Sequence, residues 1–311
     1  MANQVVITTF WNQIQENLFR GAEFLNYAVS HDAFVNGANV ELPQAGDVGD
    51  VLIDQGDVVL PMAISPREDG KATYPLYNFR IPPTLIEDSE ALELSYDKAS
   101  SVFRNHIDKL NQSVGDFGAF NLAVDPTSTY ATGRVIRTTG TAIAAATPAG
   151  STGNRKSLLI NDLAKARAIM GNDNVPEMDN FYCLMPSNMY WDFVNANKEV
   201  LNNDYMNKAN LPMGIVSYVH GWYIINRGET ARYNATATAK KAYGAAIAAD
   251  DCGAAICWNA NYVCRALGST RIYSDLDKPE YQGDIYSSRT RFNNKALRTD
   301  LKGLVAIVQE A

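Results

Sequence analysis

The two side chains best suited to nucleophilic chemistry are Cys183 and His220, a thiol and a base. A cysteine attacks only as its thiolate, which a nearby base or cation must stabilise. Cys183 lies instead in the apolar run from Phe181 to Met185, where burial would raise the pKa of the thiol and keep it protonated. We therefore expect both residues to have structural roles.

Neighbouring carboxylates are the next candidates, because a pair can act as general acid and base. The pairs here are Glu87 with Asp88 and Asp250 with Asp251, and adjacent residues of a strand point to opposite faces. The chain also lacks the nucleophile elbow G-x-S-x-G, the phosphate loop G-x-x-x-x-G-K-[ST], the H-E-x-x-H helix and a G-x-G-x-x-G turn after a strand. The sequence predicts no catalytic residue and a protein that is not an enzyme.

Metal ligands are sought among the cysteines and histidines. Cys252, Cys257 and Cys264 form no C-x-x-C pair, and the three histidines are scattered along the chain. A structural zinc site needs closely spaced ligands, whereas isolated free cysteines are usually buried. We expect buried thiols, with neither a metal nor a cofactor.

Composition and charge narrow the class of protein. The chain has 311 residues, of which 46% are hydrophobic, enough for a sizeable core. Its formal net charge of −7 would repel phosphate, which disfavours sequence-specific nucleic-acid binding. No apolar run approaches the roughly 20 residues of a membrane helix, and residues 1–10 do not resemble a signal peptide. We therefore expect no membrane partner, and a protein that works in the compartment where it is made.

The dominant element is a long amphipathic helix from Asp97 to Leu122, entered from a strand at 91–96 with Asp97 as N-cap. Spacings of three or four place one set of apolar residues on a single face. These are Phe103, Ile107, Leu110, Val114 and Phe117. Arg104, Asp108 and Asn111 are predicted to face water or a neighbouring subunit.

Two segments before the helix contain too few apolar residues for a core of their own. Residues 1–45 carry exposed aromatics that need a surface to pack against, either on their own domain or on a neighbour. Residues 46–90 are rich in glycine and proline around short strand-like pieces at 51–53, 58–64 and 76–81, and such a loop is disordered or held by a partner. The candidate inter-subunit residues are Phe10, Trp11, Phe19, Asp54, Asp57, Arg67, Lys71, Arg80 and Arg104.

The rest of the chain mixes helices and strands. Helices are expected at 158–170, with Gly171 after its end, and after Pro186, with Ser187 as N-cap. Thr230 to Ala249 is rich in alanine and threonine and is predicted to be a surface loop. Strands are expected at 134–137, 181–185, 215–226, 254–267, 270–273, 281–292 and 303–308.

This order of elements resembles the major capsid protein of tailed bacteriophages, with its HK97-like α+β fold. Residues 174–176, Asn-Val-Pro, followed by the strand 181–185 and by a helix with Pro186-Ser187 at its start and Tyr190 within it, are similar to a stretch common in these coat proteins. The segment from Tyr281 to Val308 resembles their closing strands. The resemblance implies an N-terminal arm at 1–45, an extended loop at 46–90, a peripheral domain at 91–171 with the spine helix 97–122, an axial domain at 172–265 and completing strands at 266–311.

The resemblance also implies a function and partners. Hexamers and pentamers of the chain would form an icosahedral shell around double-stranded DNA, in a virion assembled in the bacterial cytoplasm. No segment looks like a fused scaffold or a processed prodomain, so a separate scaffolding protein, a portal and decoration proteins are implied. Three alternatives stay open: an encapsulin-like compartment without a virus, a tail-tube or other virion protein, and an enzyme of unknown class.

Overall fold

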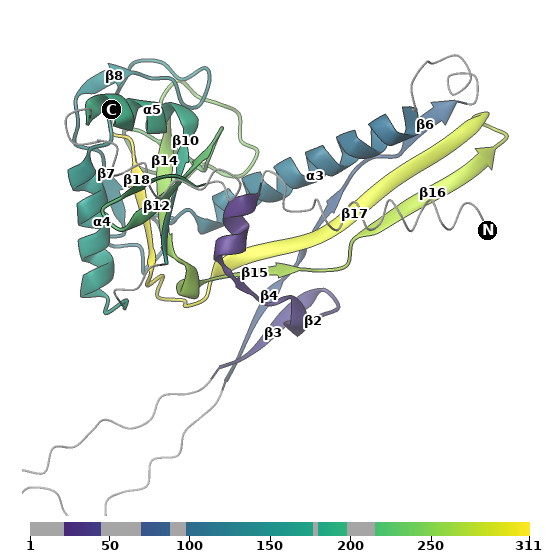
Figure 1. The fold of residues 1–311 in the computed structure, drawn as a ribbon, viewed down its shortest axis with the longest axis horizontal. Coiled ribbons are helices and arrows are strands. Elements are labelled where there is room, and N and C mark those ends of the chain that lie inside the picture. The colour runs from purple at the N-terminus through teal and green to yellow at the C-terminus, as the bar shows by residue number, and fades with distance from the viewer. Residues whose placement is uncertain (1–21, 45–69, 88–97, 177–179, 198–214) are drawn as a thin grey trace, which may run out of the picture.

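The protein is described here from a computed structural model, which describes residues 22–44, 70–87, 98–176, 180–197 and 215–311. Figure 1 shows a compact lobe, an elongated limb built on one long helix, and a narrow hairpin that leaves the limb near the lobe. The mixture of helices with mainly antiparallel sheets confirms the predicted α+β class.

The limb is a sheet backed by helix α3. Its central strand β17 pairs antiparallel with β15 and β16 along one edge and with β5 and β6 along the other. At about 3.3 Å per residue, its 14 residues span roughly 46 Å. The limb elements are β1 (Val29–Ser30), β5 (Tyr77–Arg80), β6 (Thr84–Glu87), α3 (Lys98–Leu122), β15 (Val263–Leu267), β16 (Arg271–Lys278) and β17 (Gly283–Ala296).

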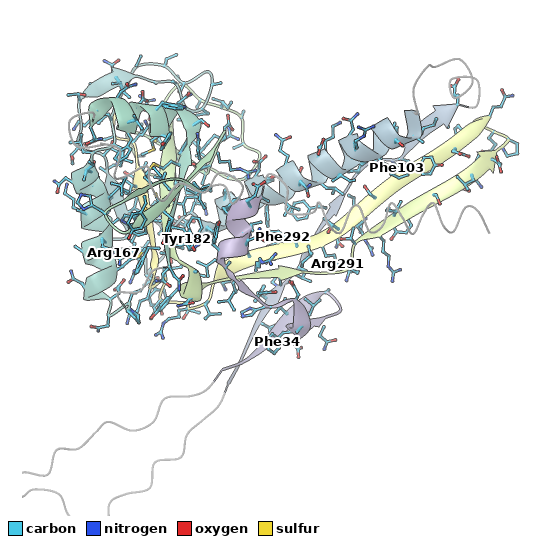
Figure 2. The ribbon with its side chains drawn as sticks, in the orientation of Figure 1. Phe34, Phe103, Arg167, Tyr182, Arg291 and Phe292 are labelled. Carbon is cyan, nitrogen blue, oxygen red and sulfur yellow. The ribbon has the colours of Figure 1, made fainter. Side chains whose placement is uncertain are left out.

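Helix α3 agrees with the predicted helix in its described range and lies along the limb sheet (Figure 1). Phe103, Ile107, Leu110 and Val114 are buried, and Phe117 is half-buried. Figure 2 shows Phe103 between the helix and β17, where its ring centroid is 4.9 Å from that of Tyr286.

The expectation for the solvent face of α3 is partly wrong. Arg104 and Asp108 are exposed, but Asn111 is only 2% exposed. The buried face is wider than the spacing predicts because β6 packs beside β17: His106 of α3 lies with its Nε2 3.0 Å from Thr84 Oγ1. The strand predicted at 91–96 and the N-cap Asp97 lie outside the described residues.

The bounds of the predicted loop at 46–90 differ in the structure. The hairpin already begins at 39, where β3 pairs with β4, while β5 and β6 belong to the limb sheet. Buried Tyr74 and Leu76 give this stretch a core, since they pack on Cys264 and Ala266 of the limb strand β15, and Ile86 of β6 is buried as well. The strand-like pieces at 51–53 and 58–64 fall outside the described residues. The hairpin strands are β2 (Val35–Asn36), β3 (Asn39–Gln44) and β4 (Gly70–Pro75).

The lobe is built on a seven-stranded sheet. Strands β10, β14 and β18 are buried along their whole length, because both faces are covered. One face meets the last turns of α3, and the other packs against α4 and α5. The lobe elements are β7 (Val135–Arg137), β8 (Ala142–Ala144), β9 (Asn154–Lys156), α4 (Ile160–Asn172), β10 (Phe181–Pro186), α5 (Ser187–Ala196), β11 (Ile215–Val219), β12 (Trp222–Arg227), β13 (Arg232–Asn234), β14 (Asp251–Asn259) and β18 (Leu304–Val308). Short 3₁₀ helices are η1 (Glu23–Tyr27), η2 (Asp32–Phe34) and η4 (Ala260–Tyr262).

Several predicted boundaries change. Gly171 lies inside α4, whose C-cap is Asp173, and Asn174 takes the left-handed conformation expected of the glycine. Ser187 is the first helical residue of α5 and not its cap, because its hydroxyl donates to Asn226 Oδ1 at 2.7 Å. Strand β7 pairs with β18, so the grouping of 91–171 with the limb divides elements that pack together in the lobe.

Candidate assembly surfaces

The joint between limb and lobe is formed where α3 ends. Lys240 Nζ donates to the carbonyl of Ala123 at 2.7 Å and lies 4.1 Å from the ring centroid of Phe120, while Tyr233 Oη donates to the carbonyl of Val124 at 2.5 Å. A cation at a helix C-terminus is favourable, because it meets the negative end of the helix dipole. Burial nevertheless lowers the pKa of Lys240 to about 8.

These two contacts correct the expectation for residues 230–249. The segment includes β13, and the side chain of Tyr233 is fully buried. Its low-complexity composition hid two residues that hold the spine helix. The sequence signal available was the presence of aromatic and basic residues, Tyr233 and Lys240 among them, within a segment rich in alanine and threonine.

Two glycines of α3 let other elements approach the joint. A Cβ at Gly115 would lie 2.5 Å from the guanidinium nitrogens of Arg227, and one at Gly118 would lie 3.0 Å from a methyl carbon of Leu25. Arg227 of β12 donates to Asp116 Oδ1 at 2.8 Å, which joins the lobe to the helix. The spacing of Gly115 and Gly118, one turn apart, was not singled out from the sequence.

An asparagine network completes the joint on the β17 side. Asn294 Nδ2 donates to the carbonyl of Gly118 at 2.9 Å, and Asn121 Nδ2 donates to Asn293 Oδ1 at 2.9 Å. Asn293 Nδ2 in turn donates to the carbonyl of Pro75 at 2.6 Å. Because these bonds link α3, β17 and the end of β4, they hold the limb and the hairpin together at the point where α3 ends.

The first described part of the predicted arm packs on its own subunit. Ala22, Phe24 and Leu25 are buried against α3 and the lobe sheet. The ring of Phe24 also lies at an edge-to-face angle to Trp258, with centroids 6.2 Å apart. The candidates Phe10, Trp11 and Phe19 lie outside the described residues, so their expected role stays a prediction.

The other predicted inter-subunit residues are spread over the molecule. Asp54, Asp57 and Arg67 lie outside the described residues, and Lys71 is described only by its place in β4. Arg80 is exposed on β5, and Arg104 is exposed on α3. The structure does not bring Arg80 and Arg104 together, since α3 packs on the opposite face of the limb sheet from Arg80 and its cross-strand neighbours.

That opposite face carries a cross-strand row of arginines. Arg289 of β17 stands directly opposite Arg80 of β5 on one side and Arg271 of β16 on the other. A hollow of about 520 Å³ lies beside the row, between Arg80, Arg289, Tyr273 and Pro82–Pro83. We call Arg80, Arg289 and Arg271 the arginine row. Sequence reasoning missed it, because register between distant strands brings the three residues together.

The cysteines and the histidine considered for nucleophilic chemistry lie in different environments. The four cysteines are buried, and Cys257 Sγ lies 3.3 Å from Cys183 Sγ. Burial raises the pKa of the Cys183 thiol, as expected from its apolar run. His220 occupies the exposed turn after β11 with a φ of 47°. Among the described residues, no cluster of three or more His, Cys, Asp or Glu could hold a metal ion.

Within the described ranges, no helix combines the length and the apolar character needed to cross a bilayer.

Comparison with known proteins identifies the fold. No protein-family model matches the chain, and no curated protein matches it. The capsid structure of Ralstonia phage GP4 is similar over 92% of this chain and 87% of its own, with 11% identity and a TM-score of 0.65. The capsid of cyanophage P-SCSP1u matches over 91% and 85%, with 18% identity and a TM-score of 0.58.

A third match is to a virus-like particle from Pyrococcus furiosus, over 97% of this chain and 99% of that one, with 10% identity and a TM-score of 0.51. In all three, the similarity extends over lobe, limb and hairpin together and not over one sheet alone, since the coverage exceeds nine tenths of this chain. The chain therefore has the HK97-like fold of the phage capsid structures that it resembles.

Proposed function

We propose that the protein is a major capsid protein, whose copies assemble as hexamers and pentamers into an icosahedral shell around a double-stranded DNA phage genome. The observation that carries the proposal is the match of the whole subunit, limb and hairpin included, to phage capsid structures. Enzymes with a compact active-site domain have no need of a limb and a hairpin that extend away from the core.

The architecture supports a role in assembly and not in catalysis. The limb exposes both the outer face of its sheet and the solvent side of α3, which gives the subunit surface well beyond its core (Figure 1). Obligate interfaces between subunits typically bury about 2,000 Å² or more, and extended elements supply such area without a larger core.

The domain assignment follows from this proposal. The limb corresponds to the peripheral domain with α3 as its spine, and the lobe to the axial domain. The hairpin and residues 45–69 correspond to the extended loop, and residues 1–21 to the free part of the arm. The assignment moves β7 and α4 into the axial domain, because β7 pairs with β18 and α4 packs on the lobe sheet.

Partners and location belong to the same proposal. A separate scaffolding protein, a portal and decoration proteins would act with the shell, and assembly would take place in the bacterial cytoplasm before the protein becomes part of the virion. The packaged DNA would be enclosed without sequence-specific contacts, which agrees with the net charge of −7.

An encapsulin-like compartment is the second candidate. It is favoured by the similarity to the virus-like particle, which covers nearly the whole of both chains. The lower TM-score of 0.51, against 0.65 for the phage GP4 capsid, makes the viral shell the better supported of the two.

Electron microscopy and sedimentation of the purified chain test the proposal. We expect closed shells or rings of six and five subunits, alone or with a scaffolding protein. A chain that stays monomeric at high concentration, with and without the co-expressed scaffold, contradicts it. Shells that carry an enzyme and no DNA in the native host would instead support the compartment.

A further inference from the structure

Cys183 and Cys257, which we call the cysteine pair, face each other in the middle of the lobe sheet. Cys183 of β10 stands directly opposite Cys257 of β14 in the antiparallel register, and the two Sγ atoms are 3.3 Å apart. Strands β10 and β14 lie between β12 on one side and β18 on the other. The sheet therefore holds in contact two thiols that are 74 positions apart in the sequence.

The backbone positions of the cysteine pair suit a disulfide bond. Directly opposite residues of antiparallel strands have Cα atoms about 4.5 to 5.5 Å apart, and disulfides form between Cα atoms about 4.4 to 6.8 Å apart. Both side chains point to the same face, since both belong to the core beneath α4 and α5. Bond formation would bring the sulfurs from 3.3 Å to about 2.05 Å, so it requires no change in strand pairing.

Neither of the other two cysteines, both in the described part of the chain, lies opposite a cysteine. Cys252 stands opposite Tyr233 of β13 and belongs to the core on the other face of the lobe sheet. Cys264 lies on β15 in the limb, where its thiol donates to the carbonyl of Lys295 at 3.4 Å. Oxidation within one folded subunit is therefore expected to join the cysteine pair alone.

We propose that the cysteine pair is an oxidation site, at which a peroxide joins Cys183 to Cys257 by a disulfide bond after the particle leaves the reducing cytoplasm. The timing rests on the proposed function, in which shells assemble in the bacterial cytoplasm. Thiols are kept reduced in that compartment, whereas disulfides form and persist outside the cell. The chain thus assembles with free thiols and is cross-linked in the released particle.

The reaction balances with hydrogen peroxide as the oxidant. One cysteine, as its thiolate, attacks a peroxide oxygen, the O–O bond breaks, and a sulfenic acid and water are formed. The second thiol attacks the sulfenic sulfur, and the S–S bond forms as a second water leaves. The cysteine pair loses two electrons and two protons, which reduce one peroxide to two water molecules.

Burial sets the rate of this reaction. Both cysteines are 0% exposed, and burial raises the pKa of the Cys183 thiol. Because the thiolate is the form that attacks, the pair reacts slowly and through local openings of the core. Slow oxidation favours a cross-link that forms in the finished particle, and a thiol buried in its own core does not reach another subunit.

The cross-link would close a long loop within the lobe. The residues between the two cysteines include α5, β11, β12 and β13. A disulfide stabilises a protein mainly by restricting the unfolded chain, and the effect grows with the length of the loop. We therefore expect the oxidised subunit to melt about 4 to 10 °C above the reduced one.

Peptide mapping of the folded, unassembled subunit tests the site. The purified chain is treated with millimolar hydrogen peroxide, denatured in a thiol-blocking reagent and digested. We expect one cross-linked peptide pair that contains Cys183 and Cys257, with a mass about 2 Da below the sum of the two peptides, and blocked thiols at Cys252 and Cys264. Four free thiols after treatment, or a disulfide that includes Cys252 or Cys264, overturns the proposal.

Matched variants separate the cross-link from other effects of the oxidant. Cys257→Ala should abolish the rise in melting temperature, whereas Cys252→Ala, five positions earlier in the same buried strand, should keep it. A thiol reductant should reverse the rise in the unchanged chain and in Cys252→Ala. An equal rise in Cys257→Ala and the unchanged chain overturns the proposal. If Cys257→Ala does not fold, peptide mapping of the unchanged chain decides alone.

The timing is tested on particles. Thiol blocking at cell lysis should show a free cysteine pair in intracellular shells, and released particles should contain the cross-link. A pair that is already joined inside the cell, or that stays free in released particles, overturns the proposed timing. Because peptide mapping uses unassembled subunits, a chain that forms the cross-link but no shells contradicts only the proposed function, and shells without the cross-link contradict only this inference.

Discussion

The two faces of the limb sheet differ in how completely the subunit satisfies them. On the face toward α3, Phe292 is fully buried, and Thr290 Oγ1 lies 2.9 Å from Thr270 Oγ1. On the other face, Arg289, the residue before Thr290, lies directly opposite two further arginines. Arg291 and Phe292, neighbours on β17, lie on opposite sides of the strand in Figure 2. Strand alternation has thus divided one element into a face that stabilises the fold and a face left for another molecule.

The largest effect is expected from breaking the inner face. Phe103→Ala should lower the free energy of unfolding by about 3 to 5 kcal/mol, because it leaves a cavity between α3 and Tyr286. Arg104→Ala, on the exposed side of the same turn, should change it by about 0.5 kcal/mol or less. Denaturant unfolding of unassembled subunits measures both. A neutral Phe103→Ala together with a destabilising Arg104→Ala would show that the helix face is assigned the wrong way round.

The next largest effect is expected at Gly118, which has close neighbours, in comparison with Gly171, which has none. Gly118→Ala should destabilise the subunit by about 1 to 3 kcal/mol, since the new methyl would press on Leu25 at 3.0 Å. Gly171→Ala, on α4 with no atom within 4 Å, should stabilise it by about 0.5 to 1 kcal/mol. Equal shifts in melting temperature for the two variants would mean that the close approach of Leu25 to Gly118 does not limit the side chain at position 118.

Lys240 gives a pH-dependent test of the joint. Its pKa is lowered to about 8 from 10.5, so between these values the unfolded chain binds more protons and stability rises with pH. The slope has an upper limit of about 1.4 kcal/mol per pH unit. Lys240→Met should remove this contribution between pH 8 and about 9.5, below the range in which tyrosines titrate. Parallel stability curves for the two proteins over that range would contradict a buried Lys240.

The smallest effect is expected on the outer face. Arg80→Gln removes one of three opposed like charges, so the free energy of unfolding should be unchanged or should rise by up to about 0.5 kcal/mol. Thermal melts of the unassembled subunit provide the measurement. A loss above about 1 kcal/mol would mean that Arg80 has an anionic partner within its own subunit.

The elements that could be predicted from the sequence are those that depend on local periodicity. The spine helix, the apolar strand from Phe181 and the closing strand to Val308 follow from spacings within a few residues. The buried Asn111 could not be predicted, because its burial depends on the limb strands that pack against α3, which a helical pattern does not encode. Capping residues were misplaced for a related reason: a tertiary contact of Ser187 with Asn226 replaced the local one.

The candidate assembly surfaces show more clearly what local sequence patterns cannot predict. Arg80, listed among the predicted inter-subunit residues, lies on the outer face, yet its two neighbours there come from 191 and 209 positions further along the chain. Strand register, set by burial of Phe292 and Tyr286, decides which charges meet. Tyr233 and Lys240 were overlooked because alanine and threonine around them suggest a loop, while their side chains reach the end of a helix more than a hundred residues earlier.

The unbroken course of β17 has a mechanical consequence. The strand runs from the free end of the limb to Ala296, and after a link of seven residues the chain enters β18, a fully buried strand of the lobe sheet. Its hydrogen bonds to β5, β6, β15 and β16 lie across the strand direction. A pull along the limb would therefore load many of these bonds in shear at once, so tension applied at the tip is delivered to the most deeply buried sheet of the molecule and does not peel the limb apart strand by strand.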